Sequence, residues 1–281
     1  MLCFFFIINN IINMGWRDNM NFEIFYESVT GYKNKSKNKE SQDFLKYKKL
    51  DKGIICSIGD GHGINRCMYS QKGSELACSA FMDVIEDLYE NIKNDSEEIQ
   101  VDRVKSMIEN KSIQRKIQDT WRDYVKNHFI KHIPNVYNID YILYGTTLIG
   151  VLITNKMKLY MQIGDGNILE VSKDIEIIEY NKKNKVRGVL NSMYLDDAYL
   201  YIDIKFNILE NEDLKSVVLF SDGFTNSFGS LINLSESISS TIEGYKKSVF
   251  SRYNLKKQYK NYLEYLTLNK SKDDITIAFI F

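Results

Sequence analysis

The sequence predicts an α+β protein in which antiparallel β-sheets pack face to face and helices cover the outside. Short apolar runs rich in β-branched and aromatic residues recur along the 281-residue chain, and several are separated only by short turns. Such close connections favour antiparallel pairing of neighbouring strands. The segments with helical periodicity are gathered between blocks of strands. A sheet built from alternating strands and helices is therefore not expected.

The first expected strands lie in the N-terminal quarter of the chain. Residues 22–29 are mostly aromatic and β-branched and predict a strand that ends at Thr30-Gly31. A Lys-rich loop follows, and then a Lys-rich stretch that is a candidate second strand. Residues 53–58 form an apolar run that stops abruptly at Gly59-Asp60-Gly61-His62-Gly63. This pattern is typical of a buried strand that enters a tight loop.

Two helices are expected next. Apolar residues recur at three- and four-residue spacing in residues 77–89 and again in residues 113–128, before Pro134. Strands are then predicted at residues 145–153, 158–163 and 168–171, and their short connections imply that they pair as antiparallel neighbours. Further strands are expected at 199–206, 216–220 and 275–281, with a helix-permissive region at 231–268.

Composition limits the classes of function. The 37 basic and 37 acidic residues balance, so no global charge favours nucleic acid or an acidic membrane as a partner. The four cysteines form no CxxC pair, which fits a reducing cytoplasm. With a single proline and no Gly-rich linker, residues 21–281 are expected to form one domain.

The N-terminal segment is apolar, but Asn9 and Asn10 interrupt it. It is too short to span a bilayer and lacks the basic start of a signal peptide. Residues 1–20 are therefore interpreted as a poorly ordered leader or a mis-assigned start, with Met14 or Met20 as alternative starts. A membrane anchor is the remaining alternative for this segment.

Acidic residues mark the ends of several predicted strands. An apolar strand runs directly into Asp60-Gly61, Asp165-Gly166 and Asp222-Gly223, and Asp273-Asp274 precedes the last strand. Each step alone is more simply a turn. Together, carboxylates at the ends of adjacent buried strands would repel one another unless a cation lay between them. Because no Cys/His cluster suggests zinc, the sequence predicts an oxygen-rich Mg²⁺ or Mn²⁺ centre.

The order of these motifs resembles the protein phosphatase 2C family of metal-dependent serine/threonine phosphatases, in a divergent bacterial-type form. The motifs are, in chain order, Gln42-Asp43, Asp60-Gly61-His62-Gly63, Gly145-Thr146-Thr147, Gly164-Asp165-Gly166, Ser221-Asp222-Gly223 and Asp273-Asp274-Ile275-Thr276. The resemblance extends from about residue 22 to the end of the chain. It implies a four-layer α-β-β-α sandwich of two antiparallel sheets flanked by helices.

The resemblance also implies a site of two Mn²⁺ or Mg²⁺ ions, with a third, weaker ion at Asp165. Asp60 would bridge the two ions, the Gly61 carbonyl would bind one of them, and Asp222 and Asp273 would complete the carboxylates of the other. Asp43 would orient the water that is activated between the metals. Gln42 would replace the metal-binding glutamate of many family members and so weaken one site.

The implied reaction is hydrolysis of phosphoserine and phosphothreonine in proteins, with His62 protonating the departing oxygen. A monomeric cytoplasmic enzyme whose partners are phosphorylated proteins, without nucleic acid or membrane, is expected. The arginine that the family often uses to hold phosphate is absent, and Lys37 and Lys39 are the nearest candidates. Lysine supplies charge but not a bidentate fork.

Two other functions remain open at this stage. Gln42, the missing arginine and Asn226, where the family often has aspartate, favour a weakly active pseudophosphatase that binds phosphoproteins as a regulatory module. A nucleotide-binding domain that uses residues 59–63 is the weaker alternative, because the spacing matches neither GxGxxG nor a P-loop.

Overall fold

The computed structural model describes residues 22–133, 138–171, 175–177, 185–186, 189–209, 214 and 216–281. The predicted leader at residues 1–20 lies outside them. No helix among the described residues combines the length and the apolar character needed to cross a membrane.

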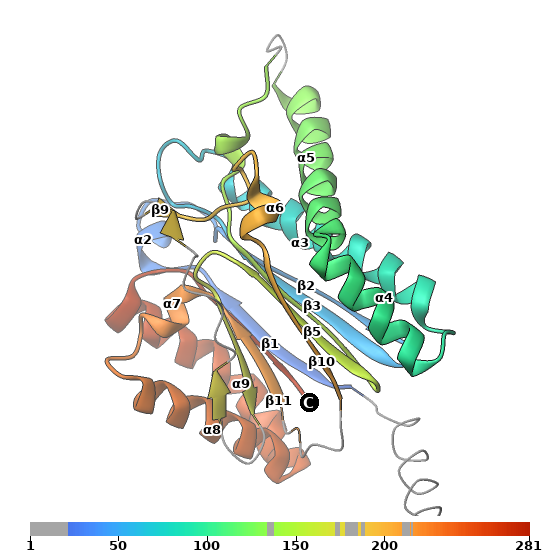
Figure 1. Ribbon diagram of the computed structural model, residues 1–281. Helices are drawn as coiled ribbons and strands as arrows, with labels where there is room; N and C mark the ends of the chain where they lie inside the picture. Colours follow the sequence, from blue (N-terminus) through green and yellow to red (C-terminus); the bar gives the residue numbers. More distant parts are fainter. Residues whose placement is uncertain are drawn as a thin grey trace, which may run out of the picture.

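Two five-stranded antiparallel sheets form the centre of the fold (Figure 1). The first, in spatial order, is β1 (Ile24–Val29), β12 (Ile275–Ile280), β11 (Ser216–Phe220), β6 (Asn167–Val171) and β7 (Ile175–Ile177). The second is β10 (Asp203–Ile208), β5 (Met157–Ile163), β4 (Leu148–Thr154), β3 (Gly53–Asp60) and β2 (Asp43–Leu50). A small separate hairpin joins β8 (Lys185–Val186) and β9 (Val189–Leu190).

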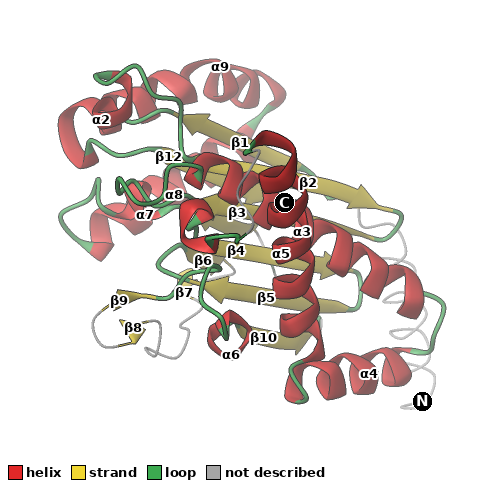
Figure 2. Cartoon of the chain, turned by 90° about the horizontal axis from the view of Figure 1, so that it is seen from above, coloured by secondary structure: helices red, strands yellow, loops and turns green. Residues whose placement is uncertain are grey.

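Helices cover the outer face of each sheet, as Figures 1 and 2 show. The second sheet is covered by α3 (Ser70–Ile92), α4 (Glu97–Glu109) and α5 (Ser112–His132), and the first by α8 (Leu231–Lys247) and α9 (Val249–Leu266). Shorter turns of helix are α2 (Tyr32–Lys35), α6 (Ala198–Tyr201) and α7 (Asp222–Thr225), with a 3₁₀ turn at Tyr141–Tyr144 and a π turn at Thr267–Ser271. The predicted four-layer α-β-β-α sandwich is confirmed.

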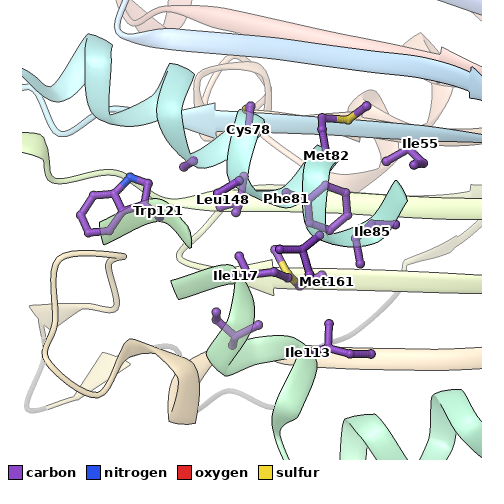
Figure 3. Close-up of a cluster of buried hydrophobic side chains, with 14 of the residues drawn as sticks. Ile55, Cys78, Phe81, Met82, Ile85, Ile113, Ile117, Trp121, Leu148 and Met161 are labelled. Atoms are coloured by element: carbon purple, nitrogen blue, oxygen red, sulfur yellow. The ribbon is translucent and has the colours of Figure 1, made fainter. Parts of the chain in front are cut away.

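Each layer boundary has its own apolar core. Along β3, Ile54, Cys56 and Ile58 pack between the two sheets, whereas Ile55 faces the helices. Side chains of one strand alternate between two buried faces, which explains why β3 reads as an uninterrupted apolar run. Figure 3 shows the helix-facing core, where Phe81 of α3 lies against the sheet.

The helical regions differ from the sequence prediction in two places. A third helix, α4, lies between the two expected ones. It begins after Ser96, whose Oγ accepts a hydrogen bond from the Ile99 amide, but it buries little apolar surface, so its periodicity is weak. The expected strand at residues 199–206 begins only at Asp203, because residues 198–201 form α6.

The pairing expected for β5 and β6 was also wrong. β5 lies in the second sheet, whereas β6 pairs with β11 in the first. The turn Gly164-Asp165-Gly166 therefore carries the chain from one sheet to the other. Gly164 has a φ of +101°, which only glycine adopts readily. A short connection between two strands can thus join packed sheets instead of making a hairpin.

Candidate metal centre and active site

A polar pocket of about 250 Å³ lies at the end of the sandwich where α2 and α7 sit (Figure 1). Its lining residues are Lys33, Asn34, Lys37, Gln42, Asp60, Gly61, His62, Gly63, Thr147, Asp165, Asp222, Asp273 and Asp274. Most of the residues singled out in the sequence meet here, although they come from segments far apart in the chain.

The topology explains this convergence. Asp43, at the start of β2, is the register partner of Asp60 at the end of β3. β11 and β12 are antiparallel neighbours, so the end of β11, before Asp222, lies beside the start of β12, after Asp274. The crossover turn that carries Asp165 opens into the same pocket. Both sheets therefore contribute carboxylates to one end of the sandwich.

These carboxylates are crowded and poorly compensated. Burial, followed by the charges of Asp43, Asp222 and Asp165, raises the pKa of Asp60 well above its ordinary value. Burial and then Asp274 raise the pKa of Asp43 to about 7, and burial and then Asp273 raise that of Asp222. Within the described part of the chain, no lysine or arginine forms an ion pair with Asp43 or Asp60.

The residues fit a hard divalent cation by two observations. Oδ1 of Asp43 is buried without a hydrogen-bond partner, while Oδ2 accepts a hydrogen bond from Ser221 Oγ at 2.7 Å. Nε2 of Gln42 donates to Ser70 Oγ at 2.5 Å, so the amide oxygen Oε1 is the group left for a cation. An unsatisfied buried oxygen within an all-oxygen donor set suits Mg²⁺ or Mn²⁺.

The candidate ligands lie in one pocket but are not closed around one point. No group of three His, Cys, Asp or Glu side chains among the described residues is already arranged to hold a metal ion. Asp222 accepts a hydrogen bond from Asn226 Nδ2 at 3.1 Å and also hydrogen-bonds with Asp60. A cation would have to compete with these contacts.

His62 lies in the pocket immediately after Asp60 and Gly61, which form the candidate metal loop. Its amide donates to the Gly145 carbonyl at 3.0 Å, and its ring Nε2 lies 2.8 Å from Ser192 Oγ. Burial lowers the pKa of His62 to about 4. The ring of Tyr194 packs edge-on, with ring centroids 6.1 Å apart. Ser192 carried no signal in the sequence, because it stands in none of the motifs.

Asp274 fixes the loop that brings lysines to the pocket. Its carboxylate accepts hydrogen bonds from the Gly31 amide at 2.6 Å, Asn34 Nδ2 at 2.9 Å and the Gln42 amide at 2.7 Å. A Cβ on Gly31 would lie 2.2 Å from the carbonyl carbon of Asp273, so only glycine allows this approach.

Lys33 and Lys37 line the pocket, whereas Lys39 is not among its lining residues. Lys33 Nζ lies 3.4 Å from Asp273 Oδ2 in a partly exposed pair. Sequence reasoning missed Lys33, because only the short helix α2 turns it towards the carboxylates.

The model of the family described as protein phosphatase 2C matches residues 30–264. Among curated proteins, none matches the chain by sequence. Several solved structures share its fold. The serine/threonine phosphatase Stp1 from Staphylococcus aureus is 16% identical with a TM-score of 0.60, over 93% of this chain and 95% of that chain.

Two further structures show how widely the fold is shared. The catalytic domain of the serine/threonine protein phosphatase PstP, solved with two manganese ions, is 10% identical with a TM-score of 0.52, over 92% of this chain and 97% of that chain. A sex-determining protein of C. elegans is 12% identical with a TM-score of 0.57, over 93% of this chain and 65% of that chain. These likenesses establish the fold, and the family match, which spans most of the sequence, establishes that this chain belongs to the protein phosphatase 2C family.

Proposed function

We propose that this protein hydrolyses phosphoserine and phosphothreonine in other proteins, at a centre of two Mn²⁺ or Mg²⁺ ions. One observation carries the proposal: Asp60, Asp222 and Asp273 converge with His62 on one polar pocket, and among the described residues no lysine or arginine pairs with Asp60. Family membership and the two manganese ions of the PstP structure support it. The proposal includes a monomeric, cytoplasmic protein with phosphorylated proteins as partners.

The metal ligands in this proposal come from four segments of the chain. Asp60 would be shared by both ions, the Gly61 carbonyl and Gln42 would serve one, and Asp222 and Asp273 would serve the other. Asp43 would orient the activated water through its Oδ1, which has no hydrogen-bond partner. Asp165 would hold a third ion. When bound, the ions would lower the pKa of a water and offset charge on the phosphoryl oxygens.

The remaining pocket residues would bind the substrate and complete the reaction. Lys33 and Lys37 would attract the phosphate as point charges, without the two-pronged geometry of arginine. Lys39 stays a weaker candidate for this role. His62 would give a proton to the departing serine or threonine oxygen, a contribution typically of about 10²–10⁴-fold.

The second candidate function is a phosphoprotein-binding module with little turnover. It is favoured by Gln42, a neutral ligand, and by Asn226, whose amide occupies an oxygen of Asp222. Both features would weaken metal binding without closing the pocket. The two functions use the same residues and differ only in whether phosphate is released.

The test is hydrolysis of p-nitrophenyl phosphate and a phosphothreonine peptide across a range of Mn²⁺ concentrations. We expect metal-dependent turnover that falls at least about 10²-fold in Asp60→Asn and Asp222→Asn, because each variant removes a ligand charge. Asp87→Asn is the matched control, since Asp87 is a surface carboxylate paired with Lys116 on the helix layer. It should retain full turnover.

The opposite result is equally clear. If the unmodified protein is no faster than Asp60→Asn at any Mn²⁺ concentration, the catalytic proposal is wrong. Titration calorimetry with the same phosphopeptide then tests the binding module, which requires binding by the unmodified protein.

A further inference from the structure

Ser192 contacts the ring of His62 through one ring nitrogen. Its side chain is fully buried, and its Oγ lies 2.8 Å from His62 Nε2. The same oxygen accepts a hydrogen bond from the Thr146 amide at 3.2 Å and donates to the Thr146 carbonyl at 2.9 Å. Ser192 thus has three polar neighbours, and only one proton of its own to share among them.

Counting protons assigns the direction of each hydrogen bond. The Thr146 carbonyl oxygen can only accept, so its 2.9 Å approach to another oxygen requires the Ser192 hydroxyl proton between them. The Thr146 amide can only donate, and it uses one lone pair of Ser192. The remaining lone pair faces His62, so Nε2 must carry a proton and donate it to Ser192.

The other edge of the imidazole is left for chemistry. A Cβ on Gly145 would lie 2.8 Å from His62 Cδ2, so the Cδ2–Nε2 edge packs against the backbone of residues 145–146. None of the described residues hydrogen-bonds with Nδ1, and His62 lines the pocket. The hydrogen bond made by one ring nitrogen decides what the other can do.

We propose that Ser192 is the positioning residue of His62, and that it commits Nε2 to the protein and makes Nδ1 the nitrogen that exchanges a proton with substrate. This inference rests on the proposed phosphatase function. As a water oxygen bonds to phosphorus and the bond from phosphorus to the serine or threonine oxygen breaks, the electron pair of the broken bond stays on that oxygen. This oxygen takes the Nδ1 proton of a ring that is protonated on both nitrogens. The ring is then neutral with Nε2 still protonated, and it recovers a proton from solvent.

The same contacts tie the ring to the metal loop. Thr146 Oγ1 donates to the Asp60 carbonyl at 3.0 Å, and the Thr147 amide donates to it at 2.8 Å. The Met193 amide donates to the Thr146 carbonyl at 3.0 Å and anchors the segment that carries Ser192. Residues 145–147, just before β4, therefore contact both His62 and the backbone of Asp60, and shared contacts of this kind keep the groups of a rigid site aligned.

The direct test is the tautomer of His62 in the ¹⁵N-labelled full chain, read from long-range ¹H–¹⁵N correlations. The chain has only three histidines, and His62→Gln identifies the signal. We expect the neutral ring to carry its proton on Nε2 in the unmodified protein, and to become a mixture of tautomers in Ser192→Ala. Finding the proton on Nδ1, or an unchanged tautomer in Ser192→Ala, overturns the proposal.

Ser216→Ala is the matched control, because Ser216 is also buried and its Oγ donates to the Ile280 carbonyl at 2.8 Å. It loses a comparable hydrogen bond outside the pocket. The tautomer of His62 should not change in this variant. The measurement on the unmodified protein needs no variant at all, so it remains decisive if Ser192→Ala folds poorly.

A second readout separates proton donation from general damage. p-Nitrophenolate leaves readily without a proton, whereas a threonine alkoxide needs one. We expect Ser192→Ala to lower kcat for a phosphothreonine peptide by about 10–100-fold and to change kcat for p-nitrophenyl phosphate by less than about 3-fold. An equal loss on both substrates would contradict a positioning role.

The two proposals fail separately. If the unmodified protein hydrolyses neither substrate with Mn²⁺, the phosphatase function is wrong, and the tautomer measurement still decides whether Ser192 sets the ring. If turnover is present and the tautomer does not respond to Ser192→Ala, the phosphatase function stands and the role of Ser192 is wrong.

Discussion

Glu170 and the Asp43–Asp60 pair are both buried carboxylates of the sandwich, and the protein compensates them differently. Lys158 Nζ lies 2.6 Å from Glu170 Oε1, and Tyr160 OH donates to Oε2 at 2.6 Å, between β5 and β6. At the pocket, in the part of the chain that the structure describes, the neighbours that raise the pKa of Asp60 are other carboxylates. The charge of Glu170 is balanced by a neighbouring lysine, whereas the charges of Asp43 and Asp60 are not balanced by any described side chain.

The difference indicates that the positive charge needed to balance Asp43 and Asp60 comes from a bound cation. Burying a charge is costly unless it is paired and hydrogen-bonded, and the Lys158–Glu170 pair shows that this sandwich can supply such a partner. Among the described residues, Asp43 and Asp60 at the pocket have no such cationic partner. We therefore expect opposite responses when a charge is removed from each region.

The largest effect is expected from Lys158→Met. The substitution leaves Glu170 buried without its cation, which should lower the free energy of unfolding by about 3–5 kcal/mol. Urea denaturation measures the change. The proposed phosphatase turnover of the folded fraction should not change, because Lys158 is not among the pocket residues. The double variant with Glu170→Gln should recover most of the loss. A loss below about 1 kcal/mol would remove the contrast between the two regions.

Asp43→Asn should act in the other direction. Without metal, it removes a buried charge that repels Asp60 and Asp274, so the free energy of unfolding should rise by about 1–2 kcal/mol. In saturating Mn²⁺ the unmodified protein should gain about 2–3 kcal/mol by binding, and the variant should gain less. Thermal unfolding in EDTA and in Mn²⁺ measures both. The comparison breaks if Asp43→Asn destabilises the metal-free protein as Lys158→Met does.

The smallest effect is a dependence of stability on pH. The pKa of Asp43 rises from its ordinary 3.8 to about 7 on folding, so between these values the folded protein binds more protons than the unfolded chain. Stability is then fullest below about pH 4 and is lost as pH rises towards 7. The Tm in EDTA should fall by a few degrees across this range, and Mn²⁺ or Asp43→Asn should flatten the slope. A flat profile in EDTA would contradict the raised pKa.

Much of the pocket could be predicted from the sequence, because its carboxylates stand at strand ends. Asp60, Asp165 and Asp222 each follow an apolar strand directly, so strand pairing alone brings them to one end of a sandwich. The four layers were predictable for the same reason, since buried strands and amphipathic helices leave distinct periodicities. These are local signals that the tertiary structure preserves.

The features that sequence reasoning missed depend on contacts between distant segments. Lys33 enters the pocket only because Asp274, from a distant part of the chain, fixes the start of its loop. Ser192 matters only through the fold that places it on His62. The passage of the chain from one sheet to the other between β5 and β6 was hidden, because a three-residue connection is equally suited to a hairpin. No periodicity distinguishes these cases.

Asp274 also has a consequence for how this family member can diverge. The carboxylate of Asp274 binds Gly31 and Asn34 near one end of the Lys-rich loop and Gln42 at the other. It therefore holds the two ends of the loop together. Each doubling of such a loop costs only about 0.6 kcal/mol in closure entropy. The residues between Asn34 and Gln42 can therefore change in length and charge while Gln42 keeps its place. Under the proposed function, substrate preference can evolve in that loop, Lys37 included, while the carboxylates of the pocket keep their places.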